Sequence, residues 1–179
     1  MIITISGDAG SGKSTCAKGL AQVLGLKHYS SGDLMRQIAI DRSMTLEGLC
    51  KVAELSNEID NELDKRQENL GKTEDNFIID GRLSAYFIPH AIKVFLVAPI
   101  EERALRIFKD NRDIEHADSI EKTIEMILMR RKSEEKRYLA WYNFNPYNLD
   151  EYNIVYDTFH KGIDMMIEDV KQLIIDHQV

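Results

Sequence analysis

The sequence predicts an α/β fold in which helices flank a parallel five-stranded sheet, within a single domain that spans residues 1–179. Two observations support this prediction. Short β-branched runs alternate with longer segments in which apolar residues recur at helical spacing, a pattern typical of a parallel sheet covered on both faces. The chain has 179 residues, 44% of them hydrophobic, which is enough to bury the core of one compact domain.

Short apolar runs mark the expected strands. The run at 2–5 stops at a serine and a glycine, the run at 77–79 stops at Asp80 and Gly81, and Pro99 follows the run at 92–97. The expected strands are residues 2–5, 27–30, 77–79, 92–97 and 153–156.

The segments between these runs are expected to be helical. Apolar residues recur on one face of 13–24, and Gly25 ends that segment. Residues 31–70 are expected to form two helices separated near Ser43, with Thr45 as an N-cap. The other expected helices are residues 100–108, 118 or 119 to about 142, and 163–177.

The charge and composition of the chain indicate which partners and which cellular compartment to expect. The formal net charge of -7 argues against broad binding to DNA or RNA, because such binding needs a positive face. Cys16 and Cys50 are too few for a disulfide framework and lack metal-ligand spacing. No apolar run approaches the length of a membrane span, and a strand that begins at Met1 leaves no room for a signal peptide. We therefore expect a cytoplasmic monomer that binds neither nucleic acid nor membrane.

A glycine-rich turn separates the first expected strand from the first expected helix. Residues 7–14 match G-x-x-x-x-G-K-[ST] at every fixed position. The glycines let successive N–H groups face a phosphate, Lys13 can reach the β- and γ-phosphates, and Ser14 can ligate Mg²⁺. A turn that only packs tightly is disfavoured, because the motif lies between a strand and a helix. The predicted ATP-binding residues here are Gly7, Asp8, Ala9, Gly10, Ser11, Gly12, Lys13, Ser14 and Thr15.

The residues that follow the third expected strand are candidates for the metal and for the acceptor. The Asp80 carboxylate, beside the phosphate loop, can hold Mg²⁺ together with Ser14; the alternative is that Asp80 caps the next helix. Gly81 permits close approach of a ligand, and Arg82 can point into the acceptor cleft.

A second acceptor segment follows the second expected strand. Residues 29–36 read Tyr-Ser-Ser-Gly-Asp-Leu-Met-Arg and resemble the S-x-G-x-x-x-R run that opens the acceptor domain of nucleoside monophosphate kinases. This resemblance implies that Arg36 binds the phosphate of the acceptor nucleotide, with Ser31 and Gly32 beside it. The alternative is that Arg36 is a solvated helix residue.

Asp60, Asp64 and Gln67 lie close to one face of an expected helix. Cytosine presents an amino donor, and a carboxylate is a suitable acceptor for it. We interpret these three residues as candidates for binding the acceptor's base, although acidic residues on an exposed helix often only aid solubility.

Residues 130–138 carry five cations in nine positions. Phosphoryl transfer places negative charge on the equatorial oxygens, so arginines that fold over the site stabilise the transition state. Arg130 and Arg137 lie on one helix face within a predicted lid at 110–145. With Lys13 of the phosphate loop, they are the predicted catalytic residues. The alternative is an exposed helix with i,i+4 ion pairs. Arg103 and Arg106, on the preceding helix, are predicted to meet the donor nucleotide.

Taken together, the chain resembles the short archaeal-type cytidylate kinases, which are nucleoside monophosphate kinases of the P-loop class. The matching segments are 7–14, 29–36, 59–67, 80–83, 99–106, 130–138 and 149–158. The resemblance implies a P-loop NTPase fold with a helical acceptor-binding insertion at 31–70 and a short lid at 110–145. From the R-x-x-x-D-x-x-R pattern of bacterial members, it implies that Arg130 and Glu134 lie near the acceptor ribose and Arg137 on phosphates.

Three positions depart from the family pattern. Asp8 puts an acid in the phosphate loop; because it would repel a phosphate, we expect it to face solvent. Asp80 stands where archaeal members often have glutamate, and Tyr86 where a tryptophan is frequent. The Tyr- and Asn-rich segment 138–152 has no chemical explanation in the sequence and is expected to be a packed connection.

The predicted activity is transfer of the γ-phosphoryl group of ATP to CMP, and to dCMP, with Mg²⁺. Alternatives are an adenylate kinase or another nucleoside monophosphate kinase, and a metabolite kinase acting on shikimate or dephospho-coenzyme A. An alternative of another class is an ATP-dependent switch or assembly factor; the acceptor-type arginines Arg36 and Arg82 weigh against it.

Overall fold

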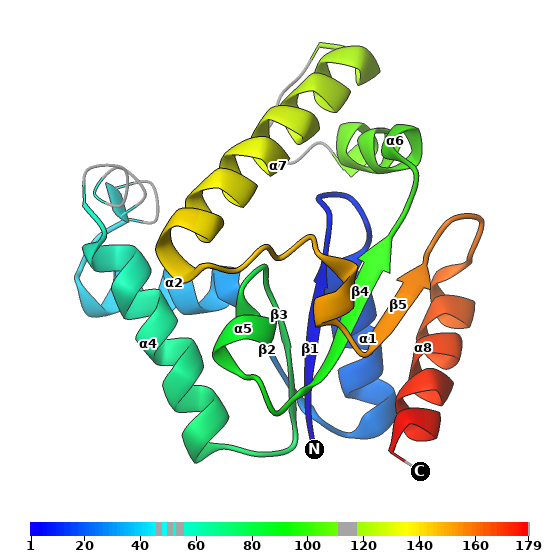
Figure 1. Cartoon of the computed structure of the whole chain (residues 1–179), viewed down its shortest axis with the longest axis horizontal. Coiled ribbons are helices and arrows are strands. Elements are labelled where there is room, and N and C mark those ends of the chain that lie inside the picture. The colour runs from blue at the N-terminus through cyan, green and yellow to red at the C-terminus, as the bar shows by residue number, and fades with distance from the viewer. Residues whose placement is uncertain (46–47, 50–51, 53–55, 111–117, 179) are drawn as a thin grey trace.

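The computed structural model describes residues 1–45, 48–49, 52, 56–110 and 118–178. Its centre is a parallel five-stranded sheet with the strand order β2-β3-β1-β4-β5 (Figure 1). The strands are β1 (Ile2–Gly7), β2 (Lys27–Ser30), β3 (Phe77–Asp80), β4 (Ile92–Val97) and β5 (Ile154–Asp157). The predicted parallel sheet is confirmed, with small shifts at the strand ends.

The helices follow the predicted pattern. They are α1 (Lys13–Leu24), α2 (Ser31–Asp41), α4 (Glu58–Thr73), α5 (Ser84–Phe87), α6 (Ile100–Asp110), α7 (Ile120–Tyr142) and α8 (Ile163–His177). The single turn α5 and the 3₁₀ turn η1 (Leu149–Glu151) were not expected, because such short elements carry too few residues to show a periodicity.

One face of the sheet packs against α1 and α8. Side chains alternate between the two faces of a strand, and Ile3 and Ile5 of β1 point to this side. There they form a core with Leu20 of α1 and Val170 of α8, and all four side chains are fully buried. This buried core holds β1, and the glycine-rich turn follows directly after that strand.

The other face is covered by α5 and by the segment that follows α7. Phe95 of β4 packs against Tyr152, with ring centroids 4.8 Å apart, and against Tyr147. The expectation that 138–152 forms a packed connection is therefore confirmed. On this face, Tyr147 and Tyr152 of the irregular segment after α7 cover the sheet, a role that a long helix has on the opposite face.

The region 31–70 holds α2, most of α4 and a small core of its own, which includes Ile38, Leu49 and Ile59. The break near Ser43 is present: Ser43 has a φ of 53°. The Thr45 hydroxyl accepts a hydrogen bond from the Gly48 amide at 3.1 Å, as an N-cap does. Of the helix predicted to run from Thr45 to residue 70, residues 46–47, 50–51 and 53–55 lie outside the described residues, and the later part is α4, which begins at Glu58.

Helix α7 begins after Ser119, whose hydroxyl accepts from the Lys122 amide at 3.3 Å. Figure 1 shows α7 passing over the carboxyl ends of the strands, next to α6 at one end and toward α2 and α4 at the other. Residues 111–117 of the predicted lid lie outside the described structure. Across the described ranges, no helix combines the length and apolar composition needed to cross a membrane.

We predict that Ile5→Ala destabilises the fold by about 2–5 kcal/mol, because it removes buried methyl groups and leaves a cavity beneath the glycine-rich turn. The matched control is Ile40→Ala, since the Ile40 side chain is 68% exposed and its loss leaves no cavity. Urea unfolding of the two variants measures both free energies. Equal stabilities for Ile5→Ala and Ile40→Ala would contradict the packing described for β1.

Candidate active site

A cavity of about 690 Å³ opens where β1 gives way to the glycine-rich turn. Its walls come from the phosphate loop and α1, from the residue after Gly81, from α6 and α7, and from the start of α8 with the segment before it. The lining residues are Ala9, Gly10, Gly12, Lys13, Ser14, Thr15, Arg82, Glu102, Arg106, Ile107, Arg130, Thr158, Lys161, Ile163 and Met166. The structure thus brings the phosphate loop, Arg82, Arg106 and Arg130 around one cavity, whereas none of the described lining residues comes from the predicted acceptor region 31–70.

The phosphate loop depends on glycine at two positions. Gly10 and Gly12 have φ angles of 78° and 91°, which lie in the left-handed region that side chains rarely adopt. A methyl group on Gly10 would also lie 2.5 Å from the Arg103 carbonyl oxygen. The loop can therefore direct its amides into the cavity only with the glycines that the motif specifies.

The Lys13 ammonium group folds back over this loop and donates to the Asp8 carbonyl oxygen at 2.7 Å. Burial and then the nearby Arg82 guanidinium lower the pKa of Lys13 to about 7, against the opposing effect of Asp80, Asp8 and Glu134. The positive charge of the Lys13 ammonium group is therefore disfavoured in this position, and the negative charge of a bound phosphate would stabilise it.

Ser14 and Asp80 meet as predicted for a metal site. The Ser14 hydroxyl donates to Asp80 Oδ2 at 2.8 Å, and His28 Nε2 lies 2.6 Å from Oδ1. The alternative that Asp80 caps a helix is wrong, because α5 begins after Leu83 and has no side-chain cap. A hydroxyl and a carboxylate are the hard oxygen ligands that Mg²⁺ prefers beside nucleotide phosphates, so the residues fit this ion. His28, which orients the carboxylate, was not predicted.

The two arginines of α6 lie differently. Arg106 lines the cavity and donates to the Thr158 hydroxyl at 2.9 Å and to its carbonyl at 3.0 Å. Arg103 is buried, donates from Nε to the Ala98 carbonyl at 2.9 Å and is not among the described cavity-lining residues. Of these two arginines, Arg106 is therefore the one placed to meet a donor nucleotide in the cavity.

The expectation that Asp8 faces solvent is wrong. The residue is only 6% exposed, and its Oδ1 atom lies 3.3 Å from Arg131 Nη1 and 3.7 Å from Arg103 Nη1. The acid avoids repelling a phosphate by turning away from the cavity toward two arginines. The sequence shows the carboxylate but not these partners.

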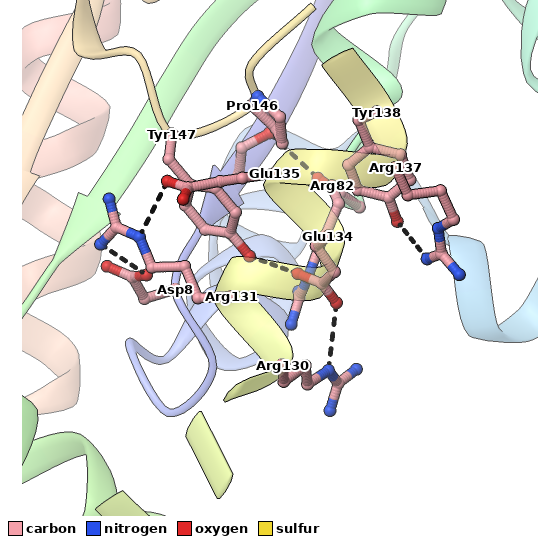
Figure 2. A network of polar contacts seen from close by, with 12 residues as sticks. Asp8, Arg82, Arg130, Arg131, Glu134, Glu135, Arg137, Tyr138, Pro146 and Tyr147 are labelled. Carbon is pink, nitrogen blue, oxygen red and sulfur yellow. Dashed lines mark hydrogen bonds and ion pairs between the residues drawn. The ribbon is translucent and has the colours of Figure 1, made fainter. Parts of the chain in front are cut away.

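The Glu134 carboxylate is the centre of a polar network between α7 and the sheet (Figure 2). It accepts from Arg82 and from the Tyr147 hydroxyl through one oxygen and from Arg130 Nε at 3.1 Å through the other. Burial is the largest influence on its pKa and raises it, but the two arginines and the tyrosine together lower the pKa. Glu134 therefore holds Arg82 and Arg130 at the cavity rather than facing it.

The predicted acceptor residues are only partly brought together. Ser31 lies against Gly81, where a methyl group would be 3.4 Å from its Cβ, and the buried Gln67 accepts from Ser84 at 2.8 Å. Arg36 is exposed and pairs with Asp33 on the same helix. Gly32 lies in the first turn of α2. Arg36 therefore has the solvated position of the alternative interpretation.

The acidic face of α4 contacts the end of α7. The Tyr142 hydroxyl donates to Asp64 Oδ2 at 2.5 Å. Burial, opposed by this hydrogen bond and aided by Asp60 and Glu68, raises the pKa of Asp64 to about 6. Burial also raises the pKa of Asp60, while Arg137 acts in the opposite direction.

Arg137 lies apart from Arg130. Its guanidinium is 5.0 Å from the centre of the Tyr138 ring and 5.7 Å from that of Trp141. It is not among the described residues that line the cavity, whereas Arg130 is. The idea that both reach the same cleft therefore holds for Arg130 alone in this structure.

The fold and the site define the chain as a P-loop kinase. A phosphate loop joins the first strand of a parallel sheet to its first helix, and lysine and arginine side chains face the cavity beside it. Solved structures with this fold include a shikimate kinase from Bacteroides thetaiotaomicron, with a TM-score of 0.69 and 15% identity over 98% of each chain. A protein from Eubacterium ventriosum reaches a TM-score of 0.71 at 18% identity and covers 99% of this chain and 97% of its own.

The family follows from the sequence comparisons. The model of the cytidylate kinase-like family matches residues 2–160. A cytidylate kinase from Methanosphaera stadtmanae is 37% identical over 97% of this chain and 98% of its own length, and one from Thermococcus kodakarensis is 39% identical over 99% and 89%. The chain belongs to the cytidylate kinase-like family.

We predict that Glu134→Gln destabilises the protein by about 2–4 kcal/mol, because it leaves the mostly buried Arg82 without its carboxylate. The matched control is Glu68→Gln, which breaks an exposed pair with Lys72 and costs less than about 1 kcal/mol. Denaturant unfolding at pH 7 compares the two variants. A loss for Glu134→Gln no larger than that for Glu68→Gln would show that the network does not stabilise the fold.

Proposed function

We propose that the protein transfers the γ-phosphoryl group of ATP to CMP and dCMP, giving ADP and the cytidine diphosphate. The match to the cytidylate kinase-like family over residues 2–160 carries this proposal. The cavity supports it, because Lys13 of the phosphate loop, Arg82 after β3 and Arg130 of α7 line the same space.

The donor nucleotide binds along the phosphate loop. Amides of the loop and the N-terminus of α1 offer partial positive charge to the phosphates. Lys13, freed from the Asp8 carbonyl, follows the β- and γ-phosphates. Arg106, held by Thr158, faces the same cavity and is suited to the donor's other phosphates or its sugar.

Ser14 and Asp80 would hold Mg²⁺. The ion supplies positive charge that neutralises the phosphate oxygens of the donor. The chain's own contribution is to fix the two oxygen ligands: Ser14 lies in the first turn of α1, and Asp80 is oriented by His28.

The acceptor needs no general base, because a phosphate monoester oxygen is already anionic near neutral pH. Catalysis then consists of alignment and of stabilising the negative charge on the transferred group. Arg82 and Arg130, which share the Glu134 carboxylate, are placed to do this from the acceptor side. Arg36 and Arg137 are proposed to reach phosphates when the acceptor is bound.

Asp64 is the proposed reader of the base, together with Asp60 and Gln67. An ionised carboxylate accepts from the amino group of cytosine, whereas uracil presents a carbonyl oxygen at that position and would be repelled. The Tyr142 hydroxyl occupies one Asp64 oxygen and leaves the other for the base.

The alternatives differ in what they require of the acceptor. An adenylate kinase would share the phosphate-binding residues, but the family match favours CMP. The likeness to shikimate kinases is one of fold, at 15% identity. An ATP-dependent switch would need no acceptor-side arginines. We also propose that the enzyme is a cytoplasmic monomer in pyrimidine nucleotide metabolism.

We predict that Lys13→Ala lowers kcat for ADP formation with ATP and CMP by about 10²-fold or more, because it removes a positioned charge from the transferring phosphates. The matched control, Lys18→Ala, lies on the exposed side of the same helix and should retain the wild-type rate. A folded Lys13→Ala variant with normal turnover would rule out the proposed role of Lys13.

We predict that the ratio of kcat/KM for CMP to that for UMP falls about ten-fold as the pH drops from 8 to 5. Asp64, with a pKa of about 6, is ionised above that pH and accepts from cytosine; below it the carboxyl is protonated and the preference is lost. Titration of the substrate phosphate cancels in the ratio. Asp64→Asn should give a low ratio that does not vary with pH, and an unchanged, pH-dependent ratio in that variant would exclude Asp64 as the base reader.

A further inference from the structure

Asp8 is an acid within a loop that binds phosphates, and its carboxylate serves neither the cavity nor the solvent. It is not among the described cavity-lining residues, and its side chain is only 9% exposed. Its Oδ1 atom faces Arg131 of α7 at 3.3 Å and Arg103 of α6 at 3.7 Å. A carboxylate costs free energy to bury unless it is paired, so this orientation needs the two arginines.

Arg131 is held from three sides. Its Nη1 atom meets Asp8, its Nε donates to Glu135 Oε1 at 3.3 Å, and its guanidinium lies 4.5 Å from the centre of the Tyr147 ring (Figure 2). The Glu135 contact lies within α7 itself, four residues along the helix. The Asp8 contact is different, because it ties α7 to the phosphate loop 123 residues away in sequence.

The neighbour of Arg131 is the arginine that lines the cavity. Consecutive helix residues point about 100° apart, so when Arg131 is held toward Asp8, Arg130 is turned to the cavity and to Glu134. The Tyr147 ring under Arg131 carries the hydroxyl that donates to Glu134, which in turn holds Arg82. A chain of contacts therefore links Asp8, through Arg131 and Tyr147, to Glu134 and so to Arg82 and Arg130, the two arginines that line the cavity on the acceptor side.

We propose that Asp8 is a positioning residue that fixes α7 over the phosphate loop through Arg131, so that Arg130 is held where the phosphoryl group passes. This inference rests on the proposed function, because its kinetic consequence is read in CMP phosphorylation. Neither Asp8 nor Arg131 is among the described residues that line the cavity. Both act through Arg130, and they should affect turnover more than ATP binding.

The test uses full-length protein: two single variants and their double variant form a thermodynamic cycle with the wild type, and a separate control variant and a charge-restoring variant accompany it. Arg131→Gln and Asp8→Asn each remove the contact, and the double variant measures whether the two effects share one origin. Arg131→Gln leaves the pair between Asp8 and the buried Arg103 intact, so it reports on the contact even if Asp8→Asn loosens the fold. Glu135→Gln is the control, because it removes the other carboxylate from Arg131 without touching the phosphate loop.

We expect Arg131→Gln and Asp8→Asn each to lower kcat with CMP about ten-fold, while the KM for ATP changes less than about two-fold. The double variant should be no slower than the slower single variant. Glu135→Gln should keep the wild-type kcat. An Arg131→Lys variant, which restores the charge, should recover part of the lost rate.

A second measurement does not depend on turnover. Hydrogen exchange of the α7 amides in the protein without nucleotide should be faster in Asp8→Asn and Arg131→Gln than in wild type, and unchanged in Glu135→Gln. If the wild type phosphorylates no nucleoside monophosphate, the proposed function fails, and this exchange experiment still decides whether Asp8 holds α7.

Several outcomes would overturn the inference. A raised KM for ATP at constant kcat in Arg131→Gln would mean that Arg131 binds phosphates directly. Multiplying effects in the double variant would mean that Asp8 and Arg131 act independently. An equal loss of kcat in Glu135→Gln would mean that the effect comes from changing the net charge of α7 and not from the contact with Asp8. Unchanged hydrogen exchange of the α7 amides in both Asp8→Asn and Arg131→Gln would show that the pair does not hold α7 in place.

Discussion

Repulsion among the cations around the phosphate loop is the constraint on which the rest of the structure depends. Lys13, Arg82 and Arg130 line one cavity, and Arg103 and Arg131 lie just behind it. Burial, and then the nearby Arg82, lower the pKa of Lys13 to about 7, although three carboxylates act in the opposite direction. A site built to bind several phosphates must hold these charges together before the phosphates arrive.

Carboxylates placed behind the cavity make this possible. Glu134 compensates Arg82 and Arg130, and Asp8 compensates Arg103 and Arg131. Both carboxylates are mostly buried and both lie outside the described cavity lining, so they offset the cations without occupying the phosphate site. Buried charges of this kind are stable only when their partners are fixed, and polar contacts tie α7 both to the phosphate loop and to Tyr147.

The elements and the phosphate loop could be predicted because their signals are local. The runs that form β1 and β4 are contiguous, and the loop's glycines and Lys13 fall within eight residues. Orientation across long sequence distances could not be predicted. Asp8 was expected in solvent because its partner is 123 residues away, and Arg36 and Arg137 were assigned to the site although the structure places neither at the cavity.

The segment 138–152 is a second case in which contacts between residues far apart in the sequence could not be predicted. Its tyrosines had no chemical explanation in the sequence, because hydroxyls at irregular spacing match no motif. In the structure Tyr147 holds Glu134, and Tyr142 holds Asp64 at the acidic face of α4. His28 was missed for a related reason: a lone histidine in a short strand shows no link to Asp80 until β2 and β3 pair.

The most direct test of this account is ADP formation from ATP and Mg²⁺ with CMP, dCMP, UMP, AMP, GMP, TMP or shikimate offered separately to the wild-type protein. We expect strong stimulation by CMP and dCMP, weaker stimulation by UMP, and little by the others. Stimulation by AMP alone, or by shikimate, would overturn the acceptor while leaving the phosphate loop intact. ATP turnover that no acceptor stimulates would contradict the proposed kinase activity.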